Sequence, residues 1–176
     1  MFKALAMSGC TAALLGTLAL TLPGADGTPA ATDDAAVERT RDTVKLLDNV
    51  YKNAVVLITE TYVHDENDFP AGAAAVELFQ RTAKDGSHSV RIIDVTGEPY
   101  DSENVAVDEF DKEGVRRLKD GEAYYDQVVS IDGEPHLRAM TAIPVVLEKC
   151  VMCHPHYKNV PQGDAIGALT YTLPVK

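Results

Sequence analysis

The sequence predicts an α+β domain built around an antiparallel sheet. Residues 33–62 have the apolar spacing of an amphipathic helix. Segments that alternate apolar and polar residues follow it, mostly in the second half of the chain. Two of these segments are joined by Asp132-Gly133, which is a strong signal for a tight hairpin. Runs of antiparallel strands with helices set apart from them are typical of the α+β class rather than of an all-helical bundle.

Helices are predicted from apolar spacing and from the residues that start and stop them. Asp33 and Asp34 are acidic residues suited to the positive first turn of a long helix. Pro70 suits the first turn of a second helix, while Gly86 and Gly121 follow the second and third helices as left-handed stops. The predicted helices span 33–62, 71–84 and 108–119.

Strands are predicted where apolar and β-branched residues alternate between turn residues. Pro144 limits the end of the strand that follows the hairpin. The predicted strands span 88–95, 124–131, 136–145 and 165–173. A short helix over 147–154 precedes the last strand, Pro155 ends this helix, and 157–164 is predicted to be a loop.

The short helix carries Cys150-Val151-Met152-Cys153-His154, which is the Cys-x-x-Cys-His signature of covalent c-type haem attachment. Two thiols three positions apart lie on one side of a helical turn, where each can add to one vinyl group of the same porphyrin. The next residue offers its imidazole to the iron, so His154 is the predicted proximal ligand. We therefore expect one haem c per chain, held by Cys150, Cys153 and His154.

A structural zinc site and a thioredoxin-like redox pair are the alternatives for a Cys-x-x-Cys motif. Zinc needs about four ligands, usually including a second Cys/His pair. A redox Cys-x-x-Cys belongs near the start of a βαβ unit in a reducing compartment. The sequence offers neither context, so haem c is favoured.

Residues 1–25 are predicted to be a secretory signal peptide. Lys3 supplies a positive end, an apolar run follows over 4–22, and Pro23-Gly24-Ala25 ends it with small residues. Cleavage is expected after this stop, or a few residues later near Ala30. A transmembrane anchor is the alternative, but glycines and threonines dilute the apolar run.

Removal of the signal peptide leaves a linker over 26–32 and one domain over 33–176, with no membrane span. Covalent haem attachment takes place outside the bacterial cytoplasm, so we expect a periplasmic protein. Cys10 offers a minor alternative as a lipoprotein acylation site, but few apolar residues precede it. If Cys10 leaves with the signal peptide, the chain's three cysteines reduce to the haem pair.

The chain is acidic, with 27 acidic and 16 basic residues and a formal net charge of −11. This charge argues against nucleic acid and anionic membrane surfaces, and it favours basic patches on a redox or signalling partner protein. Lys149, Lys158 and Arg138 are either partners for the haem propionates or ordinary surface charges. The sequence contains no Ser-His-Asp set and no phosphate-binding loop, so we expect no enzymatic activity.

The sixth position of the iron is left open by the sequence. His64, at the end of the long helix, and Met140, in a predicted strand, are the candidate distal ligands. An apolar distal side lined by Val55, Val56 and Ile58 is the alternative, and it would favour binding of a diatomic gas over simple electron transfer.

Residues 150–175 resemble the C-terminal end of a PAS-like single-haem c family, an exported haem-binding domain long known only as a domain of unknown function. In that family a Gly-Asp/Glu-x-x-Gly-Ala segment and a closing strand follow the haem motif. The matching positions here are Gly163, Asp164, Gly167 and Ala168.

The resemblance implies a PAS-like antiparallel sheet with a long leading helix, export and one haem c. Members occur alone or as the sensing part of kinases and chemoreceptors. Some members use a Cys from the leading helix as the sixth ligand, but this chain has no Cys between Thr11 and Lys149. We expect a haem protein in redox or electron-transfer chemistry; the alternative is a redox or gas (NO or CO) sensor acting through a separate partner.

Overall fold

The computed structural model describes residues 33–65 and 67–176. The predicted signal peptide, the predicted linker and Cys10 lie outside these residues. In chain order, the elements are α1 (Asp34–Tyr62), α2 (Ala71–Thr82), η1 (Ala83–Asp85), β1 (Ser89–Asp94), α3 (Glu109–Lys119), β2 (Tyr124–Ile131), β3 (Glu134–Pro144), α4 (Glu148–Cys153), η2 (Pro155–Asn159) and β4 (Ala165–Pro174).

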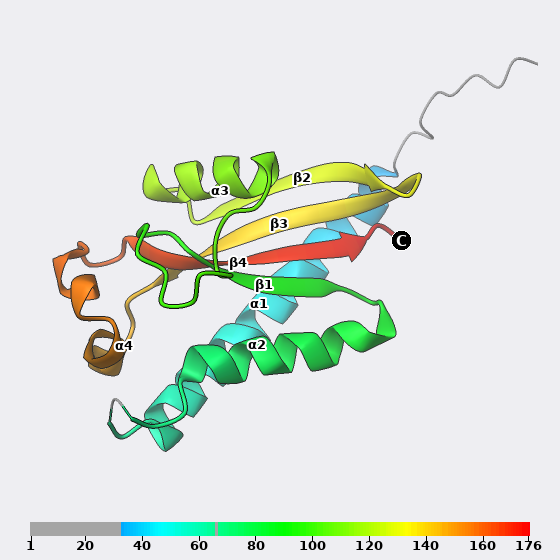
Figure 1. Ribbon diagram of the computed structural model, residues 1–176. Coiled ribbons are helices and arrows are strands. Elements are labelled where there is room, and N and C mark those ends of the chain that lie inside the picture. Colours follow the sequence, from blue (N-terminus) through cyan, green and yellow to red (C-terminus); the bar gives the residue numbers. More distant parts are fainter. Residues whose placement is uncertain (1–32, 66) are drawn as a thin grey trace, which may run out of the picture. The chain divides into compact units, whose positions relative to one another are not determined.

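The four strands form one antiparallel sheet in the order β1-β4-β3-β2 (Figure 1). β2 and β3 are joined by Asp132 and Gly133, whose φ values of 53° and 84° are the two positive angles that a type I′ hairpin turn requires. The last strand, β4, lies between β1 and β3, so that Tyr171 is paired with Val90 on one side and Ala139 on the other. The predicted α+β class, with a long leading helix and an antiparallel sheet, is confirmed.

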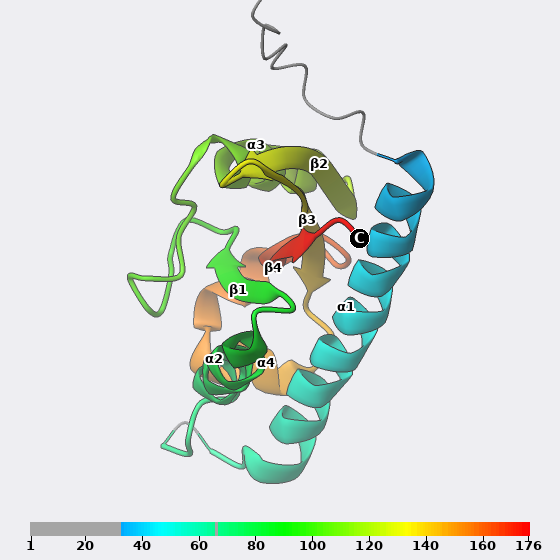
Figure 2. The same cartoon turned by 90° about the vertical axis from the view of Figure 1, so that its right-hand side faces the viewer.

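Helices cover both faces of the sheet. Figure 2, which looks nearly along the strands, shows α1 and α2 on one side and α3 on the other. Successive strand residues alternate between the two layers: Ala139 belongs to the core under α1 and α2, whereas its neighbour Met140 belongs to the core under α3. Because β4 is covered on both faces, its residues are buried without interruption from Ile166 to Tyr171.

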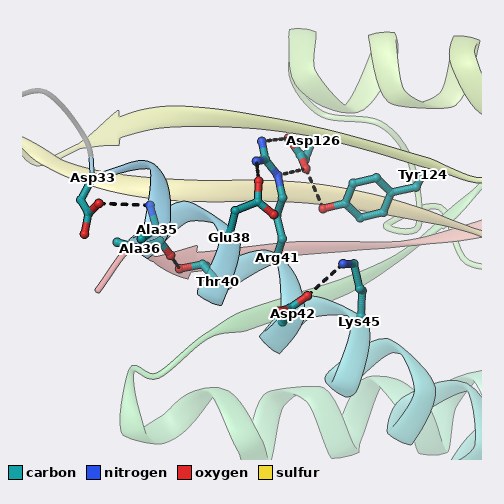
Figure 3. A network of polar contacts seen from close by, with 10 residues as sticks. All are labelled: Asp33, Ala35, Ala36, Glu38, Thr40, Arg41, Asp42, Lys45, Tyr124 and Asp126. Carbon is teal, nitrogen blue, oxygen red and sulfur yellow. Dashed lines mark hydrogen bonds and ion pairs between the residues drawn. The ribbon is translucent and has the colours of Figure 1, made fainter.

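Polar contacts attach α1 to the sheet along its length. Near its start, Arg41 forms a bidentate pair with Asp126 of β2, with N–O distances of 2.8 and 3.0 Å, and Tyr124 donates to the same carboxylate (Figure 3). Further along, Asp48 accepts hydrogen bonds from Thr141 at 2.5 Å and from Tyr171 at 3.0 Å. α1 is therefore fixed to β2, β3 and β4 by side chains as well as by its apolar face.

A buried carboxylate organises the opposite face. Asp111 of α3 has no exposed side-chain surface and accepts hydrogen bonds from Arg91 at 3.0 Å and from Arg138 at 2.9 Å. Its Oδ2 also accepts the backbone N–H of Val107 at 3.2 Å. The guanidinium of Arg138 lies over the Phe110 ring, 4.2 Å from the ring centroid. Two cations thus compensate the charge that α3 buries against the sheet.

Element boundaries lie within two residues of the predicted ones, and two short 3-10 helices were not predicted. The second helix ends at Thr82 and continues as the short 3-10 helix η1 before Gly86, whose φ is 71°. The segment after Pro155 was predicted to be a loop, but it forms η2, because a proline fits the first turn of a helix, where no backbone donor is needed. Among the described residues, no helix combines the length and apolar composition of a membrane span.

Candidate functional site

The Cys-x-x-Cys-His motif lies in an excursion between the two central strands. β3 ends with an irregularity between Ile143 and Pro144, and Pro144 is paired with Ala165 at the start of β4. Residues 145–164 therefore leave the sheet after Pro144 and return to it at Ala165, next to the point of departure. This segment contains α4 and η2. The proline has no backbone donor to continue the ladder, which explains why the chain leaves here.

The three motif residues lie on α4 and directly after it. Cys150 and Cys153 are one turn apart on α4, and both are free and partly exposed. Residues three apart lie on the same face of a helix, so both thiols face the same side. His154 caps the helix, and its backbone N–H donates to the Cys150 carbonyl at 3.2 Å.

Aromatic side chains surround the His154 imidazole. The Tyr157 ring stacks on it at 4.6 Å with an interplanar angle of 12°, and the Tyr100 ring meets it edge-on at 5.5 Å. Burial and the neighbouring His156 lower the pKa of His154, which favours the neutral imidazole that binds metals. Burial also raises the pKa of the Tyr157 phenol to about 12.

The turn after β1 lies beside the motif and contacts His156. Asp94 accepts hydrogen bonds from the Thr96 hydroxyl at 2.7 Å and from the Gly97 N–H at 2.5 Å, which fixes the turn. His156 lies against this turn, with Nε2 3.5 Å from the Thr96 hydroxyl and Nδ1 3.9 Å from a Glu98 carboxylate oxygen. Sequence reasoning missed these residues, because nothing in the local pattern shows that residues 94–100 meet the motif.

Lys149 joins α4 to the end of α1. Its ammonium donates to the backbone carbonyls of Val63 at 2.6 Å, Glu60 at 2.9 Å and Thr59 at 3.4 Å. The last turn of α1 contains no basic residue, so Lys149 supplies the positive charge that the negative end of the helix favours.

Comparison with known proteins places the chain in a family. The model of the Tll0287-like family matches residues 30–174. The chain belongs to this family. The crystal structure of the cyanobacterial heme-protein Tll0287 is similar to this Tll0287-like chain, with a TM-score of 0.58 and 13% sequence identity over 78% of this chain and 95% of that one. No curated protein matches. The single-haem family resemblance drawn from the sequence is confirmed.

The donor set of this Tll0287-like chain fits a covalently attached haem. Two thiols on one helix face can each form a thioether, and the adjacent imidazole is a common axial ligand. A hollow of about 290 Å³ with a mainly apolar lining lies against α4 and η2, and Val151, which stands between the two cysteines, is part of this lining. It is lined by Val145, Val146, Leu147, Glu148, Val151, Tyr157, Val160 and Gln162.

The two candidate distal ligands lie in different surroundings. The His64 residue is exposed just beyond α1, where its backbone N–H donates to Asp68 at 2.6 Å. Met140 is fully buried under α3, and its sulfur packs so closely on Gly114 that an added Cβ there would lie 2.6 Å from it. Met140 therefore packs in the core, and ligation by either residue stays a prediction.

The basic residues named as propionate partners have other contacts. Lys149 binds the end of α1, and Arg138 pairs with Asp108 and Asp111 under α3. Both side chains are engaged in structural contacts, and propionate binding by either of them stays a prediction. Lys158 is exposed on η2.

Proposed function

We propose that this protein is an exported monohaem c-type protein that works in redox or electron-transfer chemistry in the periplasm. The observation that carries the proposal is the placement of Cys150 and Cys153 on one face of α4, with His154 capping the same helix. The heme-protein Tll0287, which shares the fold, supports it. Haem iron, when bound, supplies a reversible one-electron couple.

The residues around the motif have separate tasks in this proposal. Cys150 and Cys153 would hold the haem by thioethers, and His154 would supply the imidazole that binds its iron. The rings of Tyr157 and Tyr100 restrict the rotation of the His154 imidazole through their stacked and edge-on contacts. We propose no catalytic role for these residues.

Sensing through a separate partner is the second candidate. The structure favours it in one respect: His64 is exposed, and Met140 packs against Gly114. Neither side chain is held toward α4 by a described contact. An iron with a free sixth position would bind a diatomic gas such as NO or CO.

Absorption and resonance Raman spectra of the ferrous protein, with and without CO or NO, separate the two functions. Low-spin iron that binds neither gas, together with a reversible one-electron titration, would support electron transfer. High-spin iron that binds either gas would support sensing and would count against a dedicated electron carrier. His64→Ala and Met140→Leu identify or eliminate the two ligand candidates if the iron is low-spin.

A further inference from the structure

A second hollow lies between α1 and the sheet, where β2 begins and β3 approaches its end. Its volume is about 460 Å³, which is within the usual range of small-molecule pockets. Tyr124 and Thr141 belong to its sheet side, and Figure 3 shows Tyr124 together with Lys45 of the helix side. We call this space the α1 hollow. It shares no lining residue with the hollow that lies against α4 and η2.

The helix side of the α1 hollow is polar. Its residues are separated by three or four positions along α1 or are direct neighbours, so they form one face of the helix. Asp48 and Lys52 pair at 2.9 Å, and their side chains are only 20% and 28% exposed. Charged side chains are seldom withdrawn from water to this extent without fixed partners. The helix residues that line the hollow are Lys45, Asp48, Asn49, Lys52 and Asn53.

The strongest hydrogen-bond acceptors of the α1 hollow already have partners. Asp48 accepts from Thr141 at 2.5 Å and from Tyr171 at 3.0 Å through Oδ1, and from Lys52 through Oδ2. The backbone carbonyl of Ala142 accepts a second hydrogen bond from the Lys52 ammonium, at 2.8 Å. The carboxylate and this carbonyl are therefore satisfied within the protein.

Donors, in contrast, remain available. An ammonium carries three N–H groups, and Lys52 uses two of them in the contacts just described, so one is left. Lys45 donates to Asp42 at 2.9 Å and keeps its other donors, because its side chain is 65% exposed. Within residues 33–65 and 67–176, no hydrogen bond engages the side-chain amide of Asn49. The α1 hollow therefore offers more donors than acceptors.

We propose that the α1 hollow binds a small organic anion whose carboxylate accepts hydrogen bonds from Lys45 and Lys52. An ionised carboxylate is purely an acceptor, and ammonium groups bind it through strong charge-assisted hydrogen bonds. The volume is many times the roughly 30 Å³ that one water molecule occupies, so there is room for a short carbon chain as well. Ala142 and the Tyr124 ring give that chain an apolar surface.

The charges around the hollow set the expected strength. Each lysine already has a carboxylate partner, Asp42 for Lys45 and Asp48 for Lys52. The local net charge is therefore close to zero, and the chain as a whole is acidic, so long-range attraction for an anion is absent. Direct hydrogen bonds have to provide the affinity, and we expect a dissociation constant between about 1 mM and 1 μM. The proposal goes beyond the haem function and does not rest on it.

Isothermal titration calorimetry of the full chain, produced with its haem in an exporting host, tests the proposal with malonate and succinate at low salt. We expect saturable binding of at least one of these acids at one site. Succinamide, which has nearly the size of succinate but no charge, should not bind. Lys45→Met should weaken binding about tenfold, because it removes a charged donor. Lys84→Met is the matched control, since Lys84 is exposed and does not line the hollow.

A second variant keeps the size of the site and changes its charge. Asn49→Asp places a carboxylate in the lining and should abolish binding, while far-ultraviolet circular dichroism checks that the helix is intact. Absence of saturable binding for both acids would overturn the proposal, as would affinity unchanged by either substitution in the hollow. Equal weakening by Lys84→Met would show a non-specific charge effect, and equal affinity for succinamide would show that the guest is not an anion; each of these results also contradicts the proposal.

Discussion

Replacing Lys149 by Met should release the haem-attachment helix from the end of α1. The ammonium is held by three backbone carbonyls at 2.6, 2.9 and 3.4 Å, two of them within normal hydrogen-bond range. Met keeps most of the apolar stem, so the substitution removes the charge and the donors with little change in packing.

The expected cost follows from those contacts. A hydrogen bond to a charged group contributes about 1.5–3 kcal/mol where it is shielded from water, and a cation at a helix C-terminus contributes about 0.3–1 kcal/mol. Because Lys149 is only partly buried, solvent weakens each contact, and we expect a total loss of about 2 kcal/mol in the free energy of unfolding.

Urea unfolding of the haem-loaded protein measures this loss, and hydrogen exchange locates it. The amides of Cys150 and His154 should exchange faster in Lys149→Met, because α4 would open without the rest of the fold. Lys158→Met is the control, since Lys158 carries the same charge on the neighbouring η2 and is exposed. A loss no larger than that of the control, or unchanged exchange in α4, would refute the role assigned to Lys149.

Three further substitutions test other parts of the structure. Asp111→Ala should lower the free energy of unfolding by about 3–5 kcal/mol in urea titrations, because it leaves two arginines without their buried partner; a loss under about 1 kcal/mol would contradict this. Burial alone would raise the pKa of Asp126, but hydrogen bonds from Arg41 and Tyr124 lower it below 3.8 overall. The stabilisation that the Asp126 carboxylate contributes is therefore present above its pKa in the unfolded chain and is lost as the pH falls through its lower pKa in the folded protein. Below about pH 4, the urea midpoints of the wild type should fall more steeply with pH than those of Asp126→Asn. Tyr157→Leu should alter the electron paramagnetic resonance g values of the ferric protein by freeing the His154 imidazole, whereas Tyr157→Phe keeps the stacked ring and should not; identical spectra for both would contradict the orienting role.

Local features of this fold could be predicted well from the sequence. Helix α3 begins after Asp108, whose carboxylate accepts the Asp111 N–H at 2.9 Å, and the chain after it turns at Gly121 with a φ of 93°. The hairpin at Asp132-Gly133 was equally clear. Each of these elements is determined by residues within a few positions of it, so the local pattern contains the information.

Contacts between distant segments could not be predicted in the same way. The position of β4 between β1 and β3 depends on pairing over many residues, and the contact between Tyr100 and His154 depends on that order. The contact between Lys149 and the end of α1 was not predicted, because the sequence neighbours of Lys149 are the motif residues. The absence of a basic residue in the last turn of α1 was the available signal.

The measurement that tests the central claim most directly is acid-acetone extraction of the protein from an exporting host, followed by a pyridine haemochrome spectrum and an intact mass. We predict that the haem stays with the polypeptide, that the mass increases by one haem, and that Cys150→Ala with Cys153→Ala abolishes this retention. A chromophore that leaves with the solvent, or one that is still retained after both cysteines are replaced, would contradict covalent attachment through Cys150 and Cys153.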